Sequence, residues 1–119
     1  MKDFADALSA YRDLLGDDCV VTDTSTLRHY ETATFSTDAQ VPAVLRPANI
    51  EQVQGILRIA NEYETPIYPI STGLNTGSGS SVPLPASLAS LIVELKRLDE
   101  IGKFNAELGY VRVLPGVTE

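Results

Sequence analysis

A strand–helix–strand pattern over residues 41–71 constrains the fold of this chain more than any other feature. The segment Val41–Pro47 is apolar and bounded by prolines, which favours an extended strand. Asn49 follows as a helix N-cap candidate, and Gln52 lies three residues later, where a capping box requires it. The helix face that we expect to be buried consists of Ile50, Val53, Leu57 and Ala60. A second strand is expected over Thr65–Ser71, so the pattern predicts a β-α-β unit with a parallel crossover.

Further elements are expected on both sides of this unit. Apolar residues recur at helical spacing from Phe4 to Leu15 and predict an amphipathic helix that Gly16 ends. The other expected elements are, in chain order, a strand over 19–22, a short helix capped by Asp23 or Thr24, a loop over 32–40, a strand over 90–95, a turn over 105–109 and a strand over 110–117. The chain of 119 residues therefore predicts one α/β (α+β) domain, with a small parallel β-α-β unit, further strands and flanking helices.

The charge balance argues against two classes of partner. Nine basic residues stand against sixteen acidic ones, for a net charge of -7, and no basic stripe is present. We therefore expect neither nucleic acid nor an anionic membrane surface as a partner. No apolar run approaches membrane-spanning length, and the N-terminus does not have the pattern of a signal peptide. These features predict a soluble, cytoplasmic protein.

Cysteine and histidine each occur once, which argues against a metal site of the usual spacing. Cys19 has no partner for an internal disulfide, and beside Val20 and Val21 we interpret it as a small buried hydrophobic residue. His29 lies beside Arg28 on the short expected helix, and we interpret it as a surface or capping residue. The sequence offers no paired catalytic candidates.

The segment Pro69–Ser81, PISTGLNTGSGSS, is rich in glycine and has no lysine or arginine. Its glycines permit positive φ and a close approach of another group to the main chain. The backbone N–H groups of such a loop can form a nest for an anion, and neutral side-chain donors accompany them. These donors are Ser71, Thr72, Asn75, Thr76 and Ser78. The loop suits a pyrophosphate, but it matches neither G-x-G-x-x-G nor the Walker pattern, and a plain surface loop is the alternative.

The order of these segments resembles that of a known flavoprotein family. The stretch RPANIEQVQGILRIANEYETPIYPISTGLNTGSGS, a later SLIVELKRLDEI and the final VLPGVTE are similar to the FAD-binding domain of the vanillyl-alcohol oxidase / p-cresol methylhydroxylase (PCMH-type) family. The two signals YPISTGLNTGSG and PGVT lie about forty residues apart. The resemblance spans residues 41–119, which it identifies as a truncated FAD-binding half, preceded by an N-terminal helical segment over 1–40.

The resemblance implies FAD as the cofactor and a set of residues that hold it. The loop should contact the FAD phosphates, largely through backbone N–H groups, and the PGV segment should line the cofactor farther along. The implied cofactor-binding residues are Pro69, Ser71, Thr72, Gly73, Leu74, Asn75, Thr76, Gly77, Ser78, Pro115, Gly116 and Val117. Leu74 departs from the family pattern, because phenol-oxidising relatives usually have Arg or Lys there, and it cannot carry a flavin covalently. Ser78 replaces the usual Tyr.

The resemblance further implies that the chain is the N-terminal portion of a flavin-dependent oxidoreductase. The parent reaction would be hydride transfer from a 4-substituted phenol or a small alcohol to FAD, with a 2-hydroxy acid as the alternative substrate class. In the family, PGVT leads into a helix, further strands and a substrate domain, so we expect the chain alone to be catalytically incomplete. The alternative is an inactive fragment or self-associating module that no longer binds FAD. Uncovered strands would present apolar faces and open edges, which predicts self-association.

Overall fold

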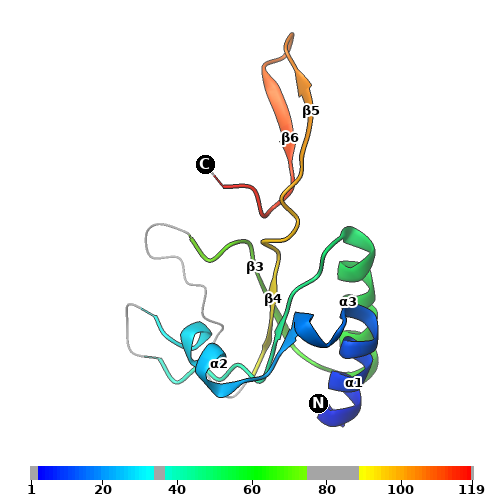
Figure 1. Cartoon of the computed structure of the whole chain (residues 1–119), viewed down its shortest axis with the longest axis vertical. Coiled ribbons are helices and arrows are strands. Elements are labelled where there is room, and N and C mark those ends of the chain that lie inside the picture. The colour runs from blue at the N-terminus through cyan, green and yellow to red at the C-terminus, as the bar shows by residue number, and fades with distance from the viewer. Residues whose placement is uncertain (1–2, 34–36, 75–88, 119) are drawn as a thin grey trace.

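The computed structural model describes residues 3–33, 37–74 and 89–118. Its elements are, in chain order, α1 (Phe4–Leu15), η1 (Asp17–Cys19), β1 (Val20–Val21), α2 (Thr24–Tyr30), β2 (Val44–Leu45), α3 (Ile50–Tyr63), β3 (Ile67–Ile70), β4 (Leu91–Glu94), β5 (Ile101–Asn105) and β6 (Tyr110–Val113). Figure 1 shows α1 and α3 beside a small sheet, with the β5–β6 hairpin projecting away from it. The expected α/β fold is confirmed. Within the described residues, no helix has the length and apolar character needed to cross a membrane.

The main sheet has the strand order β1-β2-β4-β3. Strands β2 and β3 both run parallel to β4, whereas β1 pairs antiparallel with β2. The register places Val44 opposite Ile92 and Ile67 opposite Leu91. The β2–α3–β3 crossover therefore leaves room for one strand, and β4, which comes later in the chain, occupies it. As a result, the carboxyl ends of β2, β3 and β4 meet at one edge of the sheet.

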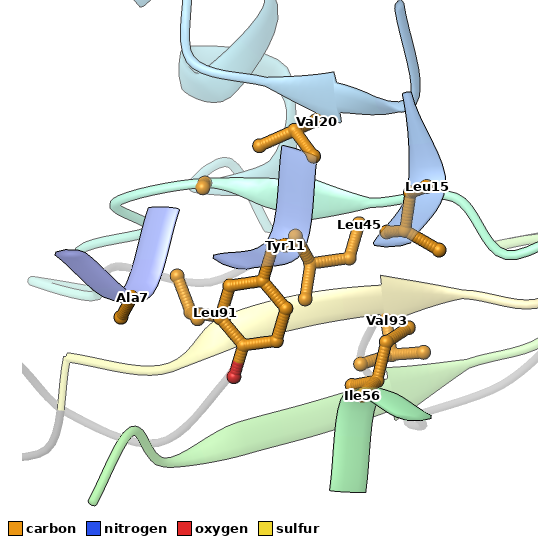
Figure 2. Packing of buried hydrophobic residues seen from close by; sticks show 9 residues of the cluster. Ala7, Tyr11, Leu15, Val20, Leu45, Ile56, Leu91 and Val93 are labelled. Carbon is orange, nitrogen blue, oxygen red and sulfur yellow. The ribbon is translucent and has the colours of Figure 1, made fainter. Parts of the chain in front are cut away.

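Both faces of the sheet are covered because its central strands carry apolar residues on both sides. On one face, α1 and α3 pack over Leu45 and Val93 in the cluster drawn in Figure 2. On the other face, α2 packs over Val44 and Ile92. Neighbouring residues along β2 and along β4 thus point to opposite faces, as the period of two in a strand requires. Tyr11 of α1 adds a buried polar contact to the first cluster, since its hydroxyl lies 2.6 Å from the hydroxyl of a threonine that precedes β3.

Side-chain caps set the starts of α2 and α3. Asn49 accepts a hydrogen bond from the Gln52 backbone N–H at 2.9 Å, as expected from the sequence. The Gln52 side chain reaches back to the N–H of Ala48 at 2.7 Å, one residue before the N-cap. Asp23 caps α2 by accepting from the Thr26 N–H at 3.0 Å. Each cap satisfies a backbone donor that the first turn of a helix leaves without a partner.

The buried face of α3 differs from the predicted one. Ile50 and Leu57 are 54% and 47% exposed, whereas Ile56 is fully buried in the cluster of Figure 2. Successive helical residues point about 100° apart, so a face centred on Ile56 turns Leu57 and Ile50 aside. A Cβ atom at Gly55 would lie 2.7 Å from Leu14 Cδ2, so α1 approaches α3 closely at this glycine. The close approach of α1, which periodicity cannot reveal, decides which apolar side of α3 is buried.

The β5–β6 hairpin was only partly predicted. The turn over Asn105–Gly109 is confirmed, with the Leu108 N–H donating to Asn105 Oδ1 at 2.9 Å and Gly109 at a φ of +69°. Strand β5, which pairs antiparallel with β6, was not predicted, and the predicted strand over 110–117 ends at Val113. Both strands are largely exposed, so no buried alternation marks β5 in the sequence.

Candidate functional site

The ends of β3 and β4 line one cavity at the carboxyl edge of the main sheet, where β2 also ends. Strand β2 ends before Arg46, β3 leads into Ser71–Leu74, and β4 ends at Glu94. The cavity has a volume of about 250 Å³ and is lined by His29, Tyr30, Ile70, Thr72, Gly73, Leu74, Glu94 and Lys96. We call it the carboxyl-end cavity. Ligands of open α/β sheets bind outside the carboxyl ends of the strands, which makes this cavity the candidate site.

The described part of the glycine-rich loop borders this cavity directly after β3. Gly73 has a φ of +76°, in the left-handed region that favours glycine. The Leu74 N–H donates to Thr72 Oγ1 at 3.3 Å and closes a tight turn. Ser71, Gly73 and Leu74 are exposed, so the loop is accessible from solvent. The predicted site residues Asn75, Thr76, Gly77 and Ser78 lie outside the described residues.

The second predicted segment, Pro115–Val117, reaches the same strand end. Gly116 is buried, and its N–H donates to the carbonyl of Leu98 at 2.8 Å. A Cβ atom at this position would lie 2.5 Å from the Lys96 carbonyl oxygen and 2.7 Å from that of Leu95, so the close approach requires glycine. The structure therefore gives Gly116 a packing role against the backbone of Lys96, whose side chain lines the carboxyl-end cavity. Lys96 thus shares the cavity lining with the first predicted segment and packs through its backbone against the second.

The other predicted residues differ in accessibility. Pro69 is exposed within β3, opposite Val93, and an edge strand such as β3 tolerates proline. Pro115 is exposed, and Val117 is half-buried with its N–H donating to the Leu114 carbonyl at 3.1 Å. Pro115 is therefore the most accessible residue of the PGV segment.

A buried carboxylate at the end of β4 organises the charges beside the cavity. Glu94 Oε2 accepts a hydrogen bond from the Tyr30 hydroxyl. Glu94 Oε1 accepts from Arg46 Nε at 3.1 Å and lies 3.1 Å from Lys96 Nζ. Arg46 Nη2 also donates to Tyr30 Oη at 3.1 Å. Two cations and one carboxylate leave this cluster with a net positive charge, in a chain of net charge -7, so an anion is the ligand that it favours.

The cluster of Tyr30, Arg46, Glu94 and Lys96 was missed from the sequence. Arg46 and Glu94 lie 48 positions apart, and only the parallel pairing of β2 with β4 brings them together. One signal was available, because Glu94 interrupts the apolar run SLIVEL. A carboxylate inside a buried strand requires a partner, and the arginine that follows the neighbouring apolar strand was a candidate.

The same contacts shift two pKa values. Burial raises the pKa of Tyr30 above its ordinary value, and the hydrogen bond to Glu94 raises it further. The hydrogen bond to Tyr30 raises the pKa of the Arg46 guanidinium, and the attraction of Glu94 adds to this effect. Arg46 therefore stays charged, and Tyr30 stays a neutral donor, at any pH near neutrality.

The stability of the chain at alkaline pH should reflect Tyr30. Because the folded-state pKa of Tyr30 is raised, its contribution to the free energy of unfolding is fully present below the unfolded-state pKa of about 10. This contribution is lost as the pH rises through the folded-state pKa. Tyr30→Phe should remove this part of the decline in unfolding free energy above pH ~10. Denaturant unfolding at stepped pH values measures this decline. Tyr11→Phe, which removes a tyrosine hydroxyl from the other cluster, is the comparison. An unchanged decline in Tyr30→Phe would contradict the assignment.

His29 and Cys19 occupy polar surroundings. His29 is exposed at the cavity and meets Tyr30 edge-to-face, with ring centroids 5.4 Å apart. Cys19 is only partly buried, and its Sγ lies 3.0 Å from Arg97 Nη1, so the interpretation as a buried hydrophobic residue is only partly right. Among the residues that the structure describes, no group of three His, Cys, Asp or Glu is placed to hold a metal ion.

Comparison with known proteins identifies the family. The family described as FAD binding domain matches residues 41–118, which is more than half of the chain. The chain belongs to this FAD binding domain family. It is 45% identical over 112 residues to 1'-carboxy-chondrochloren decarboxylase of Chondromyces crocatus, a match that covers 94% of this chain and 20% of that protein. It is 38% identical over 119 residues to the 4-cresol dehydrogenase [hydroxylating] flavoprotein subunit of Pseudomonas putida, covering 98% of this chain and 22% of the relative.

Solved structures place the chain in the same group. A p-cresol methylhydroxylase with substrate bound superposes with a TM-score of 0.84 at 36% identity, covering 97% of this chain and 22% of that one. The 4-ethylphenol oxidase of Gulosibacter chungangensis superposes with a TM-score of 0.81 at 34% identity, covering 96% and 22%. The resemblance to the PCMH-type FAD-binding domain is confirmed, and with it FAD as the cofactor. The chain spans about a fifth of the length of these relatives.

The described residues fit a diphosphate group of such a cofactor. Gly73 provides exposed backbone in the left-handed region, a conformation that occurs in anion-binding nests, and Ser71 and Thr72 add hydroxyl donors. Lys96 adds a cation to the cavity lining. The cavity volume of about 250 Å³ is below the roughly 300–1,000 Å³ of a complete ligand pocket. The described cavity therefore suits one part of a dinucleotide.

Proposed function

We propose that this chain binds the diphosphate of FAD at the carboxyl-end cavity and serves as the cofactor-binding portion of a flavin-dependent oxidoreductase. One observation carries the proposal. The left-handed turn at Gly73 and the end of β4 line one cavity whose neighbouring charges are net positive, and the Gly116 segment packs against the backbone that directly follows β4. FAD would supply the acceptor for substrate oxidation, and the residues of this chain would bind and orient it.

A 4-substituted phenol or a small alcohol is the substrate class that we propose for the complete oxidoreductase. Its support comes from the names of relatives, two of which contain 4-cresol (also written p-cresol) and one of which contains 4-ethylphenol. The relative from Chondromyces crocatus is named a decarboxylase, so the family includes a second reaction. We assign no catalytic side chain within the described residues. The substrate specificity is therefore a property of the whole enzyme, which this chain matches over about a fifth of its length.

Titration of the purified chain with FAD, followed by flavin fluorescence and absorbance, tests cofactor binding. We expect saturable binding that Gly73→Val weakens about 10-fold or more, since a β-branched residue at a φ of +76° distorts the loop. Gly109→Val is the matched control, because Gly109 has a φ of +69° in the hairpin turn, outside the cavity lining. No saturation up to about 1 mM FAD would overturn the proposal.

We further propose that the isolated chain self-associates through the β5–β6 hairpin. Six large apolar residues of the hairpin are at least 45% exposed: Ile101, Phe104, Leu108, Tyr110, Val111 and Val113. An exposed apolar hairpin with open edges favours pairing with another chain. The exposed hairpin also suits the alternative, a self-associating module that does not bind FAD. The FAD titration distinguishes this alternative from a chain that binds the cofactor.

Sedimentation of the chain across micromolar concentrations checks this proposal. Phe104 and Val111 are paired across the hairpin, so replacing both with threonine removes apolar surface while retaining strand propensity. We expect concentration-dependent association of the wild type and a shift toward monomer in this double variant. Leu57→Gln, which removes exposed apolar surface from α3, should leave association unchanged. A wild type that sediments as a monomer at every concentration would count against self-association through the hairpin.

A further inference from the structure

We infer that Lys96 is the cationic contact for the cofactor diphosphate, and that it binds this group by leaving its ion pair with Glu94. The inference rests on the proposed function, because it assigns a residue to the same site. The glycine-rich segment Pro69–Ser81 contains no lysine or arginine. Backbone N–H groups and hydroxyls of that segment can orient a diphosphate, but they carry no net charge to offset its negative charges.

Lys96 is the lining residue that can provide this charge. Of the residues that line the described cavity, it is the one lysine or arginine. Its backbone carbonyl lies against Gly116, and its side chain shares the cavity with Gly73 and Leu74. Lys96 therefore neighbours both segments expected to hold FAD, one through the cavity lining and the other through its backbone.

The ion pairs of Glu94 differ in how exposed their cations are. Lys96 Nζ and Arg46 Nε each lie 3.1 Å from the same oxygen, Glu94 Oε1. The Lys96 side chain is 47% exposed, against 26% for Arg46. Glu94 is buried, but water can solvate the half-exposed Lys96 end of the pair, so Lys96 is the cation that is released at the lower cost.

Arg46 has a different role because it is held more firmly. Its guanidinium donates to Glu94 through Nε and to Tyr30 through Nη2. If Lys96 turns toward an anion, Arg46 and the Tyr30 hydroxyl still satisfy the buried carboxylate of Glu94. The arrangement leaves one cation fixed and one cation free to move toward the ligand.

The test compares FAD with riboflavin, which has no phosphate, in titrations of the wild type and of Lys96→Gln. We expect Lys96→Gln to weaken FAD binding about 10-fold, to reduce its dependence on salt, and to leave riboflavin binding unchanged. Lys103→Gln makes the same charge change on the exposed strand β5 and should bind FAD as the wild type does. Lys96→Arg keeps the charge and should retain most of the affinity.

The outcomes separate this inference from the proposed function. If the wild type binds FAD and Lys96→Gln binds it equally well, Lys96 is only a surface partner of Glu94 and the inference fails alone. Equal weakening of FAD and riboflavin would show a structural effect of the substitution and would also overturn it. If the wild type does not bind FAD, the proposed function fails and the inference fails with it. Thermal unfolding of each variant verifies that the chains compared are folded.

Discussion

Replacing Ile56 with alanine is expected to lower the free energy of unfolding by about 2–5 kcal/mol. The Ile56 side chain of α3 is fully buried in the cluster that also contains Tyr11 of α1 and Val93 of β4 (Figure 2). Truncation removes buried methyl groups and leaves a cavity that the surrounding side chains cannot fully close. Denaturant unfolding followed by circular dichroism measures the loss.

Leu57→Ala is the control for this prediction, because the two residues are neighbours on the same helix. Leu57 is 47% exposed, so its truncation should change the free energy of unfolding by no more than about 0.5 kcal/mol. Alanine is a good helix former, so neither substitution weakens α3 itself. If Leu57→Ala lowered the free energy of unfolding more than Ile56→Ala, the assignment of the buried face of α3 to the side centred on Ile56 would be wrong.

Replacing Gly116 with alanine should destabilise the chain by about 3 kcal/mol, the upper part of the range for overpacking. A Cβ atom there would lie 2.5 Å and 2.7 Å from the carbonyl oxygens of Lys96 and Leu95. These are backbone atoms of the segment that follows β4, so relief of the clash requires the whole segment to move. We expect a reduced midpoint of denaturation and, if the chain binds FAD, a weaker affinity as well.

Gly55→Ala provides a contrast in which the obstacle is a side chain. Its Cβ atom would meet Leu14 Cδ2 at 2.7 Å, but the end of a leucine side chain can rotate away at little cost. Alanine also favours the helix relative to glycine by about 1 kcal/mol, which offsets part of the strain. A loss in Gly55→Ala as large as that in Gly116→Ala would show that the Lys96 backbone is not the decisive contact.

Prediction from sequence succeeds here where the signal lies within a few residues. Asn49 and Asp23 cap their helices because their side chains accept from N–H groups three residues later. The glycine at position 73 has the positive φ that a glycine-rich loop after a strand suggests. Family resemblance draws on the same short segments, and the match over residues 41–118 confirms it.

The arrangement that creates the candidate site depends on contacts between distant parts of the chain. Strand β4 lies between β2 and β3, although it follows both in sequence, and its continuous apolar run indicates burial on both faces but not which strands flank it. The insertion brings Glu94 to Arg46 and Lys96 to the turn at Gly73. Local hydrogen-bond geometry and side-chain period therefore determined the helices, most strands and the turn at Gly73. The strand order, the buried face of α3 and the charged cluster were decided only by tertiary packing, because their energies arise between residues that are not neighbours along the chain.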